Sequence, residues 1–146
     1  MKKLLLLGAM SLVLMGSVLL GQQVQKPFSY TFTKAGNGTC IYTGVTVDQV
    51  WAAAWEALAL NRCVIISSDK TGGTMNAERR EDLRYQYALS LFFEQMDSDV
   101  RVRAAMTDLV KSGFMPRVPS AATIHRRYTT KVYDKIAELL YGKVKK

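Results

Sequence analysis

The stretch Ser68–Met75, SDKTGGTM, holds residue types that could carry a phosphoryl group. Asp69 offers an acceptor carboxylate, Lys70 a cation, and Gly72 and Gly73 a permissive loop. Phosphoryl transfer to an aspartate also needs a nucleotide, Mg²⁺ and further carboxylates that hold the metal, and no such set is evident here. The phosphate-cradling pattern G-x-x-x-x-G-K-[ST] is absent, and no helix is expected to begin after the glycines. We therefore interpret this stretch as a turn between two strands.

The other residues that could do chemistry lack partners. His125 is the only histidine, and it stands beside Arg126 and Arg127 with no second metal ligand or acid–base partner in view. We expect it to be a solvated helix residue. Cys63 lacks a basic neighbourhood that would activate its thiol, and no serine stands in a G-x-S-x-G stretch. Solvated ion pairs are expected among charged residues near one turn: Glu78, Arg79, Arg80, Glu81, Asp82 and Arg84. The sequence thus predicts no catalytic residue, no metal site, no cofactor and no enzyme.

The chain has two cysteines, Cys40 and Cys63. In an oxidising compartment an even pair favours a disulfide, which would stabilise the fold by about 3 kcal/mol in the loop-entropy account. Both cysteines open apolar, strand-like runs, so we expect them at the same end of neighbouring strands and bonded. The alternative is two buried thiols that act as small hydrophobes.

The N-terminus predicts export. Lys2 and Lys3 precede an apolar run from Leu4 to Leu20, which is typical of a secretory signal peptide. A retained anchor helix is the alternative, although the run is short for a span and contains Gly and Ser. We expect a signal peptide over 1–21, a tether over 22–27 and one domain over 28–146, located in the periplasm or secreted. Gln22 occupies the position where a lipoprotein would need cysteine, so lipid attachment is not expected there.

Basic residues exceed acidic ones, with a net charge of +8. Such a surface suits an acidic envelope protein or an anionic membrane, and nucleic acid is not expected because the chain is predicted to leave the cytoplasm. Arg84, Arg101 and Arg103 are expected on the open face of a sheet. They form either a solvated surface or an interaction face.

The periodicity predicts the elements that position these residues. Alternation of apolar and polar side chains indicates strands over 28–33, 39–45, 63–69, 71–80, 82–97 and 98–106. Apolar residues at three- and four-residue steps indicate helices over 46–62 and 123–146. Thr46 and Gln49 form an expected capping box, with Trp55 widening the apolar face of the first helix. In the last helix the expected apolar stripe is Ile124, Tyr128, Val132, Ile136 and Leu139/Leu140. Residues 108–121 are expected to be irregular.

A resemblance rests on the runs 50–58 (VWAAAWEAL), 64–69 (VIISSD) and 73–78 (GTMNAE). This succession of helix, strand, Asp turn, glycine and strand resembles repeats of the outer-membrane assembly lipoproteins typified by BamC, over about residues 45–80. The resemblance implies a helix-grip-like α+β domain that serves as an accessory or interaction module. It implies no active-site residues.

Together these observations predict an α+β fold with the order β-β-α-β-β-β-β-α. An antiparallel sheet of five to six strands is expected to be covered on one face by two helices. We expect an exported, non-enzymatic envelope domain that binds another protein through its sheet face or edge. The alternative is a periplasmic carrier that holds a small apolar ligand between the C-terminal helix and the sheet.

Overall fold

The structure is a computed structural model that describes residues 26–80, 86–110 and 120–142. The elements are β1 (Phe28–Phe32), β2 (Gly38–Thr43), α1 (Val47–Leu60), β3 (Val64–Asp69), β4 (Thr74–Arg79), β5 (Gln86–Met96), β6 (Asp99–Val110) and α2 (Ala121–Tyr141). The predicted α+β class and element order are confirmed. Several boundaries differ by a few residues, and two of them fall inside the region that was expected to be irregular: β6 continues to Val110, and α2 begins at Ala121 behind a Ser120 cap.

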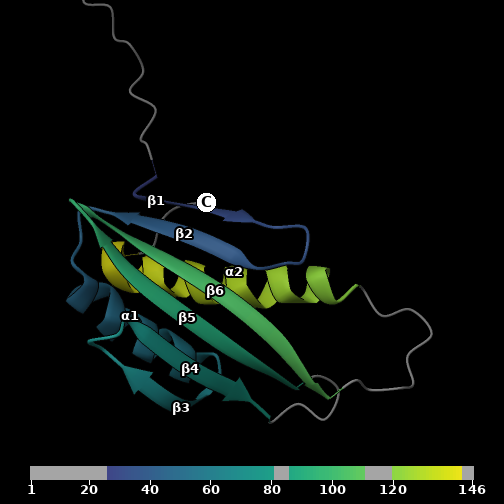
Figure 1. Cartoon of the computed structure of the whole chain (residues 1–146). Coiled ribbons are helices and arrows are strands. Elements are labelled where there is room, and N and C mark those ends of the chain that lie inside the picture. The colour runs from purple at the N-terminus through teal and green to yellow at the C-terminus, as the bar shows by residue number, and fades with distance from the viewer. Residues whose placement is uncertain (1–25, 81–85, 111–119, 143–146) are drawn as a thin grey trace, which may run out of the picture.

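The six strands form one antiparallel sheet in the order β1-β2-β6-β5-β4-β3. The long β5–β6 hairpin is inserted between β2 and β4, so strands that follow each other in the sequence do not all lie side by side (Figure 1). Both helices lie against the same face of the sheet, and α2 crosses it as the gripping helix (Figure 1). None of the described residues forms a helix on the opposite face, and β1 and β3 are the two edges.

The first helix is fixed by local sequence and by small side chains. Thr46 and Gln49 form the predicted capping box, which satisfies backbone N–H groups at the helix start. Val50, Trp51 and Leu58 are buried as expected. Trp55 is 47% exposed, which contradicts the prediction that it widens the buried face. The buried arc instead includes Ala53, Ala54 and Ala57, whose small side chains let the helix approach its neighbours closely.

The second helix buries Val132 and Ile136 as predicted, but its buried face is wider than the predicted stripe. Its buried residues are His125, Thr129, Val132, Tyr133, Ile136 and Ala137. Tyr133 anchors this face, because its hydroxyl donates to the Val102 carbonyl at 3.1 Å and its own carbonyl accepts from the Tyr42 hydroxyl at 3.1 Å. Gly36 also permits the approach, since a Cβ there would lie 2.7 Å from the Ala122 carbonyl oxygen.

Side chains fill the layer between the helices and the middle of the sheet. Alternate residues of β5 and β6 point into it as predicted, including Leu89, Leu91 and Val102, which are fully buried. Tyr42, Tyr87 and Tyr133 are also buried. The centre of the molecule is therefore a packed core, and open space has to be sought at its margins.

Candidate binding groove

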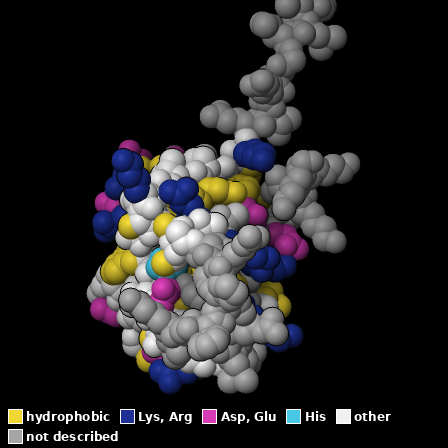
Figure 2. Space-filling model, turned by 90° about the vertical axis from the view of Figure 1, so that its right-hand side faces the viewer, with side chains coloured by type: hydrophobic (Ala, Val, Ile, Leu, Met, Phe, Trp, Pro, Cys, Tyr) yellow, Lys and Arg dark blue, Asp and Glu magenta, His cyan; other side chains and the backbone are white. Residues whose placement is uncertain are grey.

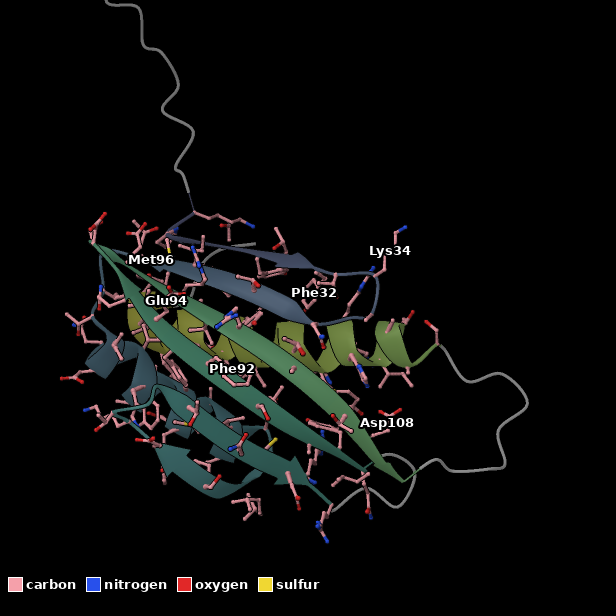
Figure 3. All side chains as sticks on the ribbon, viewed as in Figure 1. Phe32, Lys34, Phe92, Glu94, Met96 and Asp108 are labelled. Carbon is pink, nitrogen blue, oxygen red and sulfur yellow. The ribbon has the colours of Figure 1, made fainter. Side chains whose placement is uncertain are left out.

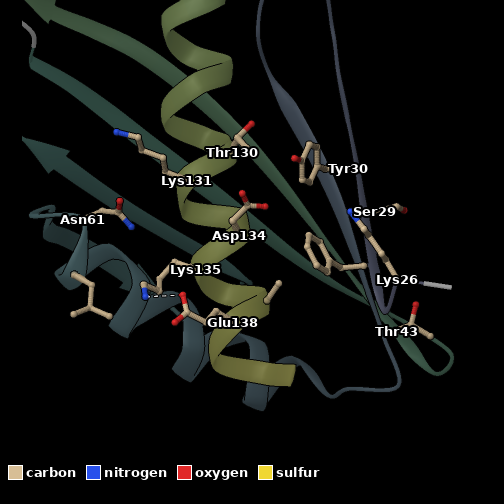
Figure 4. Close-up of a pocket in the computed structure, with 13 residues that line it drawn as sticks. Lys26, Ser29, Tyr30, Thr43, Asn61, Thr130, Lys131, Asp134, Lys135 and Glu138 are labelled. Atoms are coloured by element: carbon tan, nitrogen blue, oxygen red, sulfur yellow. Dashed lines mark hydrogen bonds and ion pairs between the residues drawn. The ribbon is translucent and has the colours of Figure 1, made fainter. Parts of the chain in front are cut away.

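An open groove of about 1310 Å³ runs along α2 (Figure 4). β1 contributes one wall through Phe28, Ser29 and Tyr30, and the end of α1 contributes Leu60 and Asn61 on the other side of α2. The residues that α2 itself contributes are Thr130, Lys131, Asp134, Lys135, Ala137 and Glu138. The volume exceeds the ~300–1,000 Å³ of ordinary small-molecule pockets. The groove is therefore large enough for a segment of polypeptide.

The β1 wall exposes backbone groups as well as side chains. Thr43 donates its N–H to the Pro27 carbonyl at 2.9 Å, and Thr33 donates to the Asn37 carbonyl at 2.8 Å. With the register Phe28↔Tyr42 to Phe32↔Gly38, the backbone groups of Ser29 and Thr31 bond to β2.

It follows from this alternation that the N–H and C=O groups of Phe28, Tyr30 and Phe32 point to the outer edge of the sheet. No strand of the described ranges pairs with them, because β1 ends the strand order. An unpaired edge of this kind is a template for one more strand.

Aromatic side chains line the base of this edge. The Tyr30 ring lies 6.3 Å from Phe28, 5.7 Å from Phe32 and 6.1 Å from Tyr133, measured between ring centroids. Tyr30 itself is 38% exposed. The row thus joins the core at Tyr133 and presents apolar surface to whatever lies along β1.

The charges of the groove have both signs. Lys135 pairs with Glu138 at 2.8 Å. Asp134 projects toward the β1 wall, and no ion pair to it is formed among residues 26–80, 86–110 and 120–142 (Figure 4). Burial and the nearby Asp134 carboxylate raise the pKa of Tyr30. Its hydroxyl is therefore a neutral donor at neutral pH, beside a carboxylate that can accept N–H groups.

The predicted arginine face is only partly described. Arg84 lies outside the described residues. Arg101 and Arg103 do lie on the open face of the sheet, where Arg101 pairs with Glu94 at 3.1 Å and the Arg103 guanidinium stands 5.8 Å from the Phe92 ring. Phe92 and Glu94 follow each other along β5 in Figure 3. The role of this face as a contact surface stays a prediction.

The predicted Cys40–Cys63 disulfide is wrong. Both cysteines are buried thiols. Cys40 is in β2, whereas Cys63 immediately precedes β3, and β6, β5 and β4 lie between these strands in the sheet. A disulfide needs Cα atoms within about 7 Å, which three intervening strands at ~4.8 Å spacing exclude. The Cys63 sulfur lies 3.7 Å from the Tyr87 hydroxyl.

The expectation for His125 is also wrong. Its side chain is 8% exposed, and its Nε2 lies 2.9 Å from Asp108 Oδ1. This pair ties α2 to the end of β6. Figure 2 views that end of the molecule, where the histidine shows as a small cyan patch and the Lys and Arg side chains are scattered.

Asp69 has the predicted turn role. Its Oδ1 accepts the Gly72 N–H at 2.9 Å in the β3–β4 hairpin. Across the described residues, no three His, Cys, Asp or Glu side chains converge as metal ligands. In the same part of the chain, none of the helices has the length and apolar character needed to span a membrane.

The sequence interpretation missed the groove. It did not single out Tyr30, Lys131 or Asp134 as site residues, because each also fits an ordinary strand or helix surface. The signal that defines the groove is the placement of β1 at the sheet edge beside α2, and this depends on the strand order.

No protein-family model matches this chain, and no curated protein matches it. Among solved structures, the crystal structure of CalU16 from Micromonospora echinospora is similar, with a TM-score of 0.48 and 10% identity over 85% of this chain and 88% of that chain. The solution structure of CalU16 has a TM-score of 0.46 and 11% identity, over 85% and 78%. The resemblance to BamC-type lipoproteins stays a prediction. Function is therefore argued from the groove itself.

Proposed function

We propose that this chain is a non-enzymatic, exported envelope domain that binds an extended segment of a partner protein along β1. The observation that carries the proposal is the unpaired edge of Phe28, Tyr30 and Phe32, of which Phe28 and Tyr30 line the groove. A peptide strand added there would bond to three outward-facing residues and lie against aromatic side chains. Main-chain bonds of this kind supply affinity with little demand on partner sequence.

The groove also sets what the partner segment should carry. A strand beside β1 would place alternate side chains toward α2. Tyr30 and Phe28 favour apolar side chains in this position, and the Asp134 carboxylate favours a neighbouring Lys or Arg. The segment expected is therefore an apolar strand with a basic residue.

The export part of the proposal rests on residues 1–21, whose basic start and apolar run are typical of a signal peptide. An envelope location would bring the groove to other envelope proteins. Export is tested by measuring the intact mass of the chain from fractionated cells, because removal of residues 1–21 lowers that mass.

The edge-pairing proposal is tested with a displayed library of random peptides about ten residues long, a typical strand length. Selected peptides should protect the amides of Phe28, Tyr30 and Phe32 from hydrogen exchange. Tyr30→Pro should lower their affinity at least about tenfold, because proline removes the outward N–H while leaving all bonds to β2 intact. Tyr30→Ala is the matched control, since it loses the same ring but keeps the N–H.

Strand addition would be contradicted if Tyr30→Pro and Tyr30→Ala lowered the peptide affinity equally and the amides of β1 were not protected from hydrogen exchange. A small-ligand carrier is the second candidate, and the apolar side chains of Phe28, Tyr30 and Leu60 in the groove lining favour it. In that case a small apolar fluorophore should saturate one site, and Tyr30→Pro and Tyr30→Ala should weaken fluorophore binding to the same extent. Leu60→Glu should abolish fluorophore binding, because Leu60 lines the groove and is 57% exposed.

A further inference from the structure

Arg79 is a cation on the helix-covered side of the sheet. It ends the alternation Met75, Ala77, Arg79 in β4, whose first two members are buried in the core. Its register partner on β5 is Tyr87. The sequence interpretation placed Arg79 in a solvated ion-pair cluster. Among the described residues of that cluster, it is Arg80 that forms an ion pair, with Nε 2.6 Å from Glu78 Oε2.

The Arg79 guanidinium lies among aromatic residues and shares a hydrogen bond with the Tyr87 side chain. Its Cζ lies 5.6 Å from the centre of the Tyr128 ring on α2. Its Nε is buried and has no hydrogen-bond partner in the structure, and no carboxylate of the described residues pairs with it. A buried donor left unsatisfied costs about 1–3 kcal/mol. The Arg79 guanidinium can therefore provide a hydrogen-bond donor and a positive charge to an anionic ligand.

A second cation meets the same ring. Lys131 follows Tyr128 by three residues on α2, and its Nζ lies 5.3 Å from the ring centre. Lys131 is exposed and forms no ion pair with the described residues, whereas Lys135, one turn further, pairs with Glu138. Figure 4 shows Lys131 on the side of α2 away from Tyr30.

Both cations lie near the Tyr128 ring, and an anion that contacts both would offset their mutual repulsion. The guanidinium provides a planar pair of donors that fits a phosphate or carboxylate, and the ammonium provides a point charge reachable from solvent. A phosphate dianion would match both charges, whereas a carboxylate would match one.

We propose that Arg79, Lys131 and Tyr128 form a binding site for a phosphate group. The phosphate group is either free inorganic phosphate or the phosphomonoester of a small molecule. The site shares Lys131 with the lining of the groove, but strand addition at β1 needs neither Arg79 nor its guanidinium.

The test is a titration with inorganic phosphate at constant ionic strength, followed by the NMR signals of the arginine Nε–Hε groups. The Arg79 signal should shift saturably. Arg79→Gln should lower the affinity at least about tenfold, as expected for loss of a charge-assisted contact, and Lys131→Gln should lower it several-fold. Arg80→Gln and Lys135→Gln are the matched controls, since each removes one nearby cation that already has a carboxylate partner.

Absence of saturation with both inorganic phosphate and glycerol phosphate would overturn the proposal, as would equal weakening by Arg80→Gln. Acetate that binds as tightly as phosphate would overturn the assignment to a dianion. Tighter binding of glycerol phosphate than of phosphate would support a phosphomonoester, and the reverse would support free phosphate. If Arg79→Gln does not fold, the exposed Lys131→Gln decides. Tyr30→Pro should leave phosphate binding unchanged, which separates failure here from failure of the β1 proposal.

Discussion

Buried thiols and hydroxyls determine how single residues of this protein respond to reagents. Cys40 is fully buried beneath α2, and burial raises the pKa of its thiol to about 12. Cys63 is 7% exposed and lies against the Tyr87 hydroxyl. Because the thiolate is the reactive form, neither access nor ionisation favours reaction of Cys40 in the native state.

We therefore expect Cys40 to resist alkylation by iodoacetamide at pH 8 while the chain is folded, and to react fully in guanidinium chloride. Mass spectrometry of the alkylated protein measures this, and labelling of Cys63 in a Cys40→Ala variant gives the comparison for the second thiol. The intact mass should not change on reduction. A gain of two hydrogens on reduction, or native labelling of Cys40 as fast as in the unfolded chain, would contradict the structure.

At the residue scale the sequence predicted burial well where alternation was strict. Leu89, Leu91 and Val102 are buried as expected because a strand has only two faces. The burial of His125 and Trp55 was predicted wrongly because side chains surround a helix on all sides. Which side faces the core is set by tertiary contacts such as those of Tyr133.

At the element scale, the β3–β4 hairpin shows what its turn residues do. Gly73 has a φ of +65°, and a Cβ there would lie 2.6 Å from the Phe93 carbonyl oxygen. The Gly73 carbonyl also accepts the Phe93 N–H at 2.8 Å. The second glycine of the Asp69–Gly73 turn is thus required by the contact between this turn and β5.

Gly73→Ala should destabilise the fold more than Gly44→Ala. Gly44 has a similar φ of +70° but nothing within 4 Å of its Cβ position, so its substitution costs only the left-handed conformation, about 1–2 kcal/mol. Gly73→Ala adds a backbone clash, so we expect at least about 1 kcal/mol beyond that. Urea unfolding of both variants measures the difference, and equal losses would mean that the β3–β4 turn does not pack on β5 as described.

Element order was predictable, but strand neighbours were not. Local periodicity and the Thr46 cap identify the strands and helices one by one. The placement of β5 and β6 between β2 and β4 depends on pairing between strands that are distant in the sequence, and local residue patterns do not determine it. The disulfide prediction failed for this reason, since it assumed that the strands of Cys40 and Cys63 are neighbours. The groove was missed for the same reason, because it exists only where β1 is an edge.

At the scale of the whole molecule, the candidate surfaces occupy different places. The β1 edge lies on one side of α2, and the proposed phosphate site lies where α2 meets β4 and shares Lys131 with the groove lining. Arg101 and Arg103 lie on the open face of the sheet, away from both helices. A strand added at β1 would leave Arg79, Arg101 and Arg103 uncovered, so the proposed contacts would not exclude one another.

The packed core should also make the whole molecule sensitive to alkali. Burial raises the pKa of Tyr42, Tyr87 and Tyr133 above the ordinary value of 10.0, and that of Cys40 from 9.0 to about 12. Between the unfolded and folded pKa values the unfolded chain has lost these protons and the native chain has kept them. Stability is then fully present below about pH 9 and falls as pH rises, by about 1.4 kcal/mol per pH unit for each such group.

We expect the ultraviolet signal of tyrosinate from the buried tyrosines to appear together with loss of near-ultraviolet circular dichroism, in one cooperative step above pH 10. Tyr42→Phe should reduce the slope of unfolding free energy against pH in this range by about one proton, because it removes one of the retained hydroxyl protons. Smooth ionisation of all seven tyrosines near pH 10, with the fold intact, would contradict the packed core. In that case the space between α2 and the sheet would be open to water, and this result would favour the small-ligand carrier function over strand addition.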